Sequence, residues 1–395
     1  MDPMNETERQ YWNTPLTGVG PGDTPKSIFR ACGAPNFDVE RFLSDDIGSI
    51  QIRRFENYIC YPDPASPEVT EYWRKKGLIK QLHDTPQKED IPQKYVDRLT
   101  AIGVCANREE ALVRYAQWAS YVPVSSLTEP ERKYPLLFVL HGGDDPIYMT
   151  ETYGFMDLAA REELIVIAPQ DAGYQNVGAL LDYALEHFPV DPSRVYCAGF
   201  SGGAAKTEDT VIAYPQRFAG AILVGQLLRT RFYGNPSREQ LDGIPQYRIP
   251  LFNIEGLTEA GRTLPMNISQ EFNPCIPDVV RTVADNCEGL NAWLAFNRCR
   301  RTVTQADMYA SAHSADVVER MIGTVFDRTH VERHFDRNYY VGEYMDDNGV
   351  AMIRIVGVED IPHWPVPSFA ELAWDYISRF RREVPSGKLI VGEQR

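Results

Sequence analysis

Short apolar segments alternate with helix-like segments from about residue 111 onward. The apolar segments, each suited to a buried strand, are residues 115–122, 134–140, 164–168, 194–198, 219–224, 249–254 and 351–356. The helix-like segments are residues 148–163, 173–187, 202–213, 286–298 and 368–382. Because strands that alternate with helices are typical of a mostly parallel sheet covered on both faces, we expect an α/β fold in which most helices connect neighbouring parallel strands.

Residues 1–110 lack this alternation and contain a proline-rich polar segment, Tyr61 to Pro67. Residues 50–55 could add a strand and residues 92–102 a short helix, but neither carries recognisable chemistry. We therefore expect an N-terminal extension that packs on a main domain of residues 111–395.

A long segment separates the apolar run that ends at residue 254 from the one that starts at residue 351, and a single crossover needs far fewer residues. We expect a helical insertion at about residues 262–345, part of which covers the functional site. Its apolar residues fit either the buried face of extra helices or the lining of an acyl pocket: Met308, Tyr309, Met321, Ile322 and Phe326.

The sequence Gly-Phe-Ser-Gly-Gly at residues 199–203 follows one apolar segment and leads into a helix-like one. Strand, Gly-x-Ser-x-Gly and helix together indicate a nucleophile elbow, a tight turn that exposes a reactive serine, here Ser201. The glycines leave room beside the serine for close backbone approach. Ser201 is thus the candidate nucleophile.

A serine nucleophile needs a base and an acid that orients the base. In the α/β-hydrolase order, serine, acid and histidine follow one another along the chain. His363 is the only one of the seven histidines that follows the last apolar segment, so it is the candidate base. Glu259, on the loop after residues 249–254, is the candidate acid. Glu255 is too close to the end of the strand segment, and Asp278, Asp285 and Asp360 are the remaining acid candidates.

The oxyanion donors should be backbone amides from the residue after the serine and from the loop after an early strand. These are Gly202 and, in the sequence His-Gly-Gly-Asp at residues 141–144, Gly143 or Asp144. His141 then has a structural role. Phe200, Trp364 and Tyr148 either form an aromatic wall of the substrate pocket or simply pack together.

Composition excludes several classes of protein. The net charge of −15 and the absence of a Lys/Arg cluster argue against a nucleic-acid partner. The sequence contains no run of 18 or more apolar residues, so we expect no membrane span. The N-terminus lacks the basic and apolar segments of a secretory signal, which favours a cytoplasmic protein or one whose signal has been removed. Oligomeric state cannot be read from the sequence.

The seven cysteines have no Cys-x-x-Cys spacing, and their number is odd. A thiolate metal site is therefore not expected. Cys197, in the segment before the elbow, fits a small buried side chain better than a redox group. We expect no metal and no cofactor.

Several further motifs resemble those of α/β-hydrolases of the poly(3-hydroxybutyrate) depolymerase and feruloyl esterase type. Residues 191–196 (Asp-Pro-Ser-Arg-Val-Tyr) resemble the family's segment before the elbow, and residues 215–219 resemble its Pro-x-x-Phe-Ala. Residues 256–259 stand where the family has Gly-x-x-Asp, and residues 293–299 resemble its Trp-x-x-x-Asn-x-Cys helix. Residues 363–365 (His-Trp-Pro) resemble its terminal His-x-Trp-Pro with one residue fewer. The resemblance covers about residues 112–382 and implies hydrolysis of carboxylic esters.

Three features depart from that family. Glutamate replaces the usual aspartate, residues 300–340 form a longer segment, and residues 339–343 lack a cysteine that often pairs with the Asn-x-Cys position. The missing cysteine fits a reducing compartment, and the substrate class stays open. Two alternatives to a serine esterase remain: a serine peptidase on the same fold, and a catalytically silent binding protein.

Overall fold

The computed structural model describes residues 22–44, 66–84, 117–143, 147–226, 248–260, 264–267 and 283–392, with a few isolated positions between them. The residues 50–55 and 92–102, for which the sequence predicts a strand and a helix, lie outside the described part apart from position 97.

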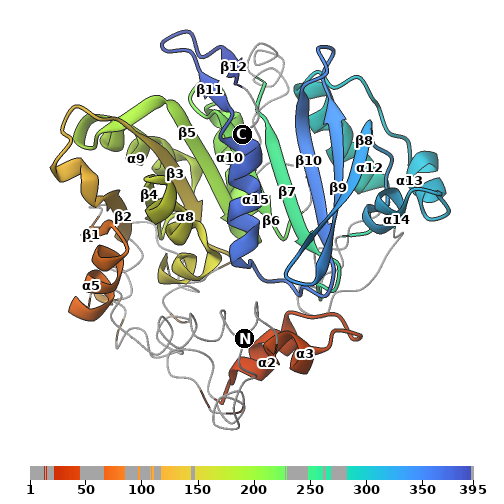
Figure 1. Cartoon of the computed structure of the whole chain (residues 1–395), viewed down its shortest axis with the longest axis horizontal. Helices are drawn as coiled ribbons and strands as arrows, with labels where there is room; N and C mark the ends of the chain where they lie inside the picture. Colours follow the sequence, from red (N-terminus) through yellow and green to blue (C-terminus); the bar gives the residue numbers. More distant parts are fainter. Residues whose placement is uncertain are drawn as a thin grey trace.

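A large sheet runs through the middle of the molecule (Figure 1), and ten of the described strands belong to it. In sheet order these are β1 (Leu78–Asp84), β2 (Gln117–Pro123), β4 (Ile165–Pro169), β3 (Tyr134–Leu140), β5 (Val190–Phe200), β6 (Gly220–Val224), β7 (Leu251–Gly256), β10 (Ala351–Val358), β9 (Arg337–Met345) and β8 (Arg328–His334). The strands from β4 to β10 in this order are parallel, and the flanking strands are antiparallel. The sheet is mostly parallel, as the alternating pattern predicts, and with its helices it forms the α/β-hydrolase fold expected from the elbow and the other motifs.

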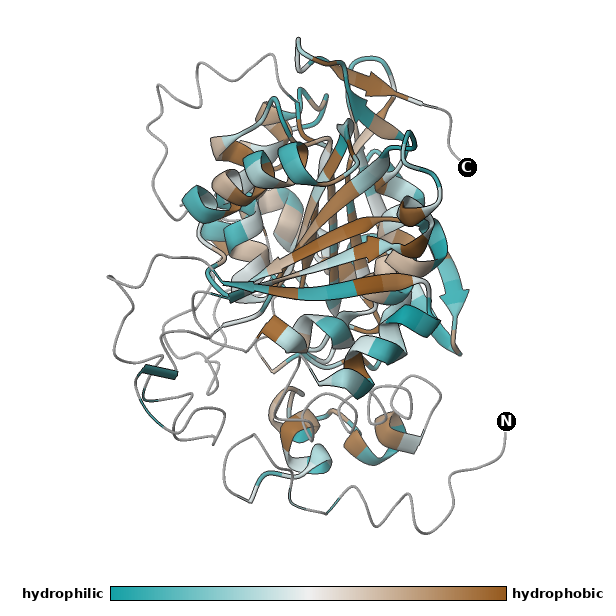
Figure 2. Ribbon diagram, turned by 90° about the vertical axis from the view of Figure 1, so that its left-hand side faces the viewer, coloured by the Kyte–Doolittle hydropathy of each residue, from teal (hydrophilic) through white to brown (hydrophobic). Residues whose placement is uncertain are grey.

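Helices cover both faces of the sheet, and each face has its own apolar core. One core includes side chains of α8 (Phe155–Glu162) and α15 (Pro367–Ile377). The other core includes side chains of α9 (Tyr174–His187), α10 (Gly202–Ala213) and α12 (Val283–Phe296). Figure 2 shows the hydrophobic strands in the centre, with more hydrophilic residues on the flanking helices. Continuously apolar strands such as β3 are buried on both faces for this reason.

Two predicted helices are shorter in the structure than in the sequence pattern. Residues 148–163 divide into the 3₁₀ helix η2 (Ile147–Tyr153) and α8, because Gly154 between them has a φ of 90°. Its Cα also lies against the start of α15, where a β-carbon would come within 2.8 Å of Pro367 Cα. The segment 368–382 ends its helix at Ile377, and its last residues form β11 (Phe380–Arg382), which pairs with β12 (Leu389–Val391).

The N-terminal segment contributes to the main sheet as well as to its surroundings. β1, which the sequence pattern does not predict, is the edge strand beside β2. The helix α5 (Pro67–Lys75) precedes it, and α2 (Pro25–Ala31) and α3 (Val39–Ser44) lie below the sheet in Figure 1. These helices therefore stand at the end of the sheet where the candidate site is found.

The insertion contributes α12, α13 (Gln305–Ser311), α14 (Val317–Ile322) and the two unexpected strands β8 and β9. Met308 and Ile322 are fully buried and Phe326 is nearly so, whereas Tyr309 is half exposed. The apolar residues of this segment thus serve mainly as core. β8 is an edge strand with exposed or half-buried residues along its whole length, so it shows no apolar pattern.

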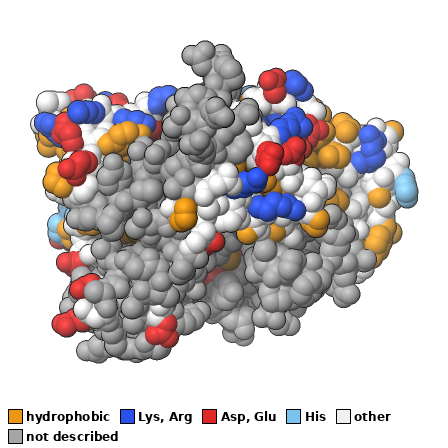
Figure 3. All heavy atoms as spheres, turned by 90° about the horizontal axis from the view of Figure 1, so that it is seen from below, with side chains coloured by type: hydrophobic (Ala, Val, Ile, Leu, Met, Phe, Trp, Pro, Cys, Tyr) orange, Lys and Arg blue, Asp and Glu red, His pale blue; other side chains and the backbone are white. Residues whose placement is uncertain are grey.

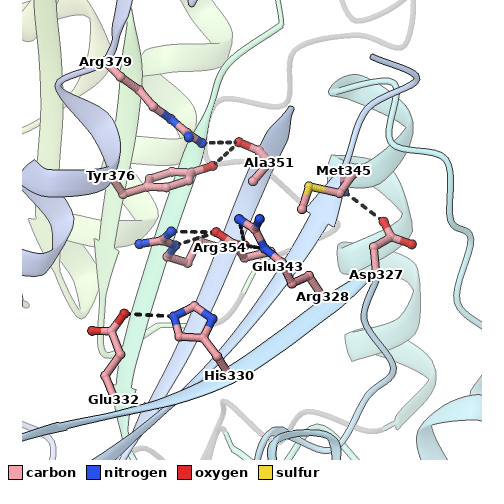
Figure 4. A network of polar contacts seen from close by, with 10 residues as sticks. All are labelled: Asp327, Arg328, His330, Glu332, Glu343, Met345, Ala351, Arg354, Tyr376 and Arg379. Atoms are coloured by element: carbon pink, nitrogen blue, oxygen red, sulfur yellow. Dashed lines mark hydrogen bonds and ion pairs between the residues drawn. The ribbon is translucent and has the colours of Figure 1, made fainter. Parts of the chain in front are cut away.

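A network of polar contacts joins β8, β9, β10 and α15 (Figure 4), and the hydroxyl of Tyr376 in α15 takes part by donating to Ala351 O. The carboxylate of Glu343 is completely buried and accepts hydrogen bonds from Arg354 Nε at 2.9 Å and Arg354 Nη2 at 2.6 Å. Arg328 pairs with the other carboxylate oxygen at 2.5 Å. Burial by itself raises the pKa of Glu343, but the charge of Arg354 and the hydrogen bonds of both arginines outweigh it and lower that pKa.

The face that carries α2 and α3 shows acidic and basic side chains interspersed over its described part (Figure 3). Within the described ranges, no helix combines the length and the apolar character that crossing a membrane requires.

Candidate active site

The elbow lies where β5 ends and α10 begins. Ser201, the residue between them, has φ 52° and ψ −116°, a region of backbone conformation that residues other than glycine rarely adopt. Its backbone N–H donates to Val224 O of β6 at 2.8 Å, and its side chain does not cap the helix. A strained backbone at a strand-to-helix turn is typical of a nucleophile elbow, where the turn exposes the side-chain oxygen of the serine above the sheet.

The glycines of the elbow are required by close backbone contacts. A β-carbon on Gly199 would run into the backbone of Gly203. One on Gly203 would run into the carbonyl groups of Leu140 and His141 at the end of β3. The pentapeptide therefore fits only because the chain can pack on itself and on the neighbouring loop without side chains.

Two candidate oxyanion donors lie next to each other. A β-carbon on Gly202 would stand 2.9 Å from the amide nitrogen of Gly143, so the two residues are in direct contact. Gly202 is the first residue of α10, where backbone N–H groups are unpaired within the helix and favour negative charge. Asp144, the other donor considered from the sequence, lies outside the described residues.

The loop that carries Gly143 is held by polar contacts that the sequence does not reveal. The N–H of Gly142 donates to the hydroxyl of Tyr153 at 3.2 Å, so it is not aimed at a substrate. His141 is buried, and its Nε2 lies 2.8 Å from the carbonyl oxygen of Gln170. The side-chain Oε1 of Gln170 accepts from Ile147 N at 2.8 Å. These contacts fix His141 within the loop, away from the pair of Glu259 and His363.

The helix η2, which contains Tyr153, is fixed by a buried carboxylate. Glu151 is 1 % exposed and pairs with Lys80 of β1. It also accepts hydrogen bonds from Tyr121 and, at 2.7 Å, from Trp73 Nε1 of α5. The sheet edge and the N-terminal helix α5 therefore hold the element that supports the oxyanion loop.

The candidate acid and base are hydrogen bonded. Glu259 Oε2 lies 2.9 Å from His363 Nδ1, and Glu259 Oε1 accepts from Gly256 N at 3.0 Å. The Glu259 side chain is 2 % exposed, whereas that of His363 is 20 % exposed. A buried carboxylate on Nδ1 fixes the ring and leaves Nε2 as the nitrogen available for proton transfer.

The imidazole lies beside the elbow. A β-carbon on Gly225, the residue after the carbonyl that binds Ser201 N, would stand 3.0 Å from His363 Cε1 and 3.0 Å from the Phe200 ring. The rings of Phe200 and His363 are 4.8 Å apart. Residues from the ends of β5, β6, β7 and β10 thus meet at one place, as the parallel strands require.

Of the predicted pocket residues, Phe200 lies against the imidazole and Trp364 lies against Phe200. Their rings are 6.1 Å apart, and both side chains are largely buried. Phe200 also packs on Tyr153 with the ring centroids 5.4 Å apart. Tyr148 lies in η2 and is buried. These contacts form an aromatic cluster around the base, and Tyr153 is the member that the sequence did not indicate.

The remaining acid candidates have other surroundings. Asp360 pairs with Arg41 at 3.0 Å, and Asp285 is on the exposed side of α12. Glu255 is buried within β7, and Asp278 lies outside the described residues. Within the described part of the chain, the carboxylate that is hydrogen bonded to the candidate base is that of Glu259.

Glu359 anchors the start of the loop that carries His363. Its carboxylate accepts hydrogen bonds from Asn338 N at 3.2 Å, from Asn338 Nδ2 at 3.1 Å and from the hydroxyl of Tyr340. Burial raises the pKa of Glu359, but the hydrogen bonds from Tyr340 and Asn338 outweigh it and lower that pKa. The loop that carries His363 is therefore held at its start, next to the end of β10, by the hydrogen bonds of the Glu359 carboxylate.

Cys197 is fully buried in β5, and burial raises the pKa of its thiol to about 12, as is typical of a packing residue. In the part of the chain that the structure describes, no group of three His, Cys, Asp or Glu side chains could hold a metal ion.

Comparison with solved structures finds partial similarity to esterases and serine hydrolases. An acetyl xylan esterase from Aspergillus awamori is 12% identical, with 74% of this chain and 98% of that chain covered and a TM-score of 0.38. An S-formylglutathione hydrolase from Agrobacterium tumefaciens is 13% identical, with 46% and 76% covered and a TM-score of 0.31. A thermostable esterase is 19% identical, with a TM-score of 0.28; 35% of this chain matches 42% of that one.

No family model and no curated protein matches the sequence. At these identities and TM-scores the similarity does not bear on substrate or mechanism.

Proposed function

We propose that this protein is a serine hydrolase that cleaves carboxylic esters through an acyl-enzyme on Ser201. The observation that carries the proposal is the hydrogen bond between Glu259 Oε2 and His363 Nδ1 beside a strained serine elbow. Acid, base and nucleophile come from three distant parts of the sequence, and a core of ordinary packing residues would not need this arrangement. The adjacent backbones of Gly202 and Gly143 add the expected site for an oxyanion.

The proposed reaction has two halves. His363 Nε2 takes the proton of Ser201 Oγ while Oγ forms a bond to the ester carbonyl carbon, and the amides of Gly202 and Gly143 stabilise the negative oxygen. The carbon–oxygen bond to the alcohol then breaks, and the alcohol leaves with the proton from His363. In the second half water takes the place of the alcohol, and the carboxylic acid is released. Glu259 stabilises the imidazolium in both halves.

The substrate class is the finer part of the proposal. The aromatic cluster of Phe200, Trp364 and Tyr153 suits an acid part that carries an aromatic or other flat apolar group. Together with the resemblance of the sequence motifs, this makes feruloyl esters the first substrates to assay, with acetyl and 3-hydroxyalkanoate esters next. The proposed mechanism requires no metal or cofactor.

The test combines activity with covalent labelling. A fluorophosphonate probe should modify Ser201 of the full-length protein, as read by peptide mass spectrometry, and p-nitrophenyl butyrate should be hydrolysed. Ser201→Ala should remove both, while Ser193→Ala, a serine at the other end of β5, should keep both. Labelling of a different serine would contradict the assignment. Faster cleavage of peptide anilides than of esters would favour a peptidase, and a folded protein that reacts with neither would be a binding protein.

A further inference from the structure

The N-terminal segment contacts the candidate acid and base through its backbone. The carbonyl oxygen of Cys32, at the end of α2, accepts the backbone N–H of His363 at 2.7 Å and that of Ala260 at 3.1 Å. One acceptor therefore serves both the loop that carries the base and the loop that carries the acid. We name residues 29–37 the strap.

A second set of bonds fixes the acid loop against the strap. Ala34 N donates to Thr258 O at 2.8 Å, and this bond together with the one from Ala260 N to Cys32 O forms an antiparallel bridge between Gly33 and Glu259. Thr258 in turn donates its hydroxyl to Ile361 O at 2.8 Å. The acid loop, the base loop and the strap thus form a closed ring of hydrogen bonds around the pair of Glu259 and His363.

Apolar packing keeps the strap in place. Phe29 is fully buried, and its ring meets that of Trp364, next to His363, edge-on at 5.4 Å. On its other side Phe29 packs on Phe42 of α3 at 5.2 Å. The turn at Gly33 is equally tight, because a β-carbon there would run into the ring of Phe37.

We propose that the strap is a positioning element of the active site, which sets the distance between Glu259 and His363. The inference rests on the proposed function for its kinetic consequences, but not for its structural ones. Both loops leave the sheet at the ends of their strands, where few ladder bonds restrain them. A displacement of about 1 Å at a reacting group can cost about 10²-fold in rate, so three backbone hydrogen bonds from outside the sheet can decide the activity.

The test replaces one backbone donor of the strap in the full-length protein. Ala34→Pro removes the N–H that binds Thr258 O, and Gly33, which pairs as an extended residue, tolerates a following proline. Ala34→Gly keeps the donor and is the matched control. We expect kcat of Ala34→Pro to fall about 10-fold or more with KM within about 2-fold, and Ala34→Gly to stay within about 2-fold of the wild type in both.

A spectroscopic readout separates this inference from the proposed function. The proton between His363 Nδ1 and Glu259 gives a far-downfield NMR signal in a histidine–carboxylate pair, whatever the protein hydrolyses. The signal should be present in the wild type and Ala34→Gly, and shifted or lost in Ala34→Pro. Phe29→Leu, which weakens the contact with Trp364 without changing a backbone hydrogen bond, should show a smaller change of the signal in the same direction. This variant provides the test of the strap if Ala34→Pro does not fold.

Unchanged signal and unchanged kcat in folded Ala34→Pro would overturn the strap as a positioning element. If Ala34→Pro does not fold, an unchanged NMR signal and an unchanged kcat in Phe29→Leu would overturn the strap as a positioning element. A wild type that shows the signal but is not labelled at Ser201 would instead overturn the proposed function.

Discussion

The amide nitrogen of Gly143 lies against the backbone of Gly202, 2.9 Å from where a β-carbon of residue 202 would stand. Any side chain at position 202 must therefore push the two proposed oxyanion donors apart. The elbow motif allows any residue at position 202, whereas this contact allows only glycine unless the backbone shifts.

Gly202→Ala should lower kcat by about 10²-fold, the size of effect expected when one oxyanion donor is lost. KM should change little, because the amides act mainly on the charge that develops in the transition state. Steady-state hydrolysis of p-nitrophenyl butyrate measures both. Gly77→Ala is the control: Gly77 has a φ of 99° with open space around it, so the variant should lose stability but keep its activity. Full activity of Gly202→Ala would remove Gly143 from the oxyanion site.

Glu259→Gln should lower kcat by roughly 10²- to 10⁴-fold, because a neutral amide no longer stabilises the imidazolium of His363. The labelling rate of Ser201 by a fluorophosphonate should fall in parallel. Asp285→Asn, at an exposed carboxylate of α12 that the sequence left as a possible acid, should change neither rate. A large loss with Asp285→Asn and none with Glu259→Gln would reverse the assignment.

Tyr153→Phe should loosen the oxyanion loop without disturbing its apolar surroundings. The variant removes the acceptor of the Gly142 N–H, a buried bond of 3.2 Å, and keeps the ring that packs on Phe200. We expect a loss of about 1–3 kcal/mol in the free energy of unfolding, the cost of a buried unpaired donor, together with a lower kcat. Urea unfolding and ester hydrolysis measure the two effects, and wild-type values for both would show that the loop is held by its other contacts.

Glu343→Gln should reduce stability most at neutral pH. The pKa of Glu343 lies below its ordinary value of 4.5, so its charge stabilises the folded protein above that pH. This contribution is lost as the pH falls through the folded pKa. Breaking the buried pair with Arg354 should cost about 3 kcal/mol at pH 7, and the difference from wild type should narrow below pH 4.5.

Urea unfolding from pH 7 down to pH 3 tests this dependence. Glu129→Gln, at a half-exposed ion pair with Arg132, is the control and should change stability little at any pH. A constant difference between Glu343→Gln and wild type over the whole range would mean that the charge of Glu343 is not what the network stabilises.

The sequence predicts those buried strands whose apolar runs are continuous. It fails for β8 and β1, which lie at the edges of the sheet and carry polar residues in a mixed pattern. It also fails for β9, which is mostly buried but whose apolar residues are interrupted by Arg337, Asn338 and Glu343. The pattern does not predict the break at Gly154 either, since one glycine inside a helical pattern does not by itself end a helix.

Some residues of the candidate site can be predicted from the sequence, and others are found only in the structure. Ser201, Glu259 and His363 follow from the order of strands and loops, and the structure brings the acid and the base into contact. The role of Tyr153 depends on a backbone N–H eleven residues earlier in the sequence. The role of Cys32 depends on a main-chain carbonyl, which every residue type possesses. Contacts of this kind leave no pattern in the side chains and can be found only in the folded chain.

The pairing of Lys80 with Glu151 makes the edge of the sheet and the oxyanion loop one cooperative unit. If β1 detached from β2, a carboxylate would be left in an apolar interior without its cation, directly behind the helix that supports Gly142. Opening of the edge and opening of the loop should therefore occur together, with the amides of both regions exchanging their hydrogens at a common rate. A strand at the edge of the sheet would then set how often the candidate active site opens.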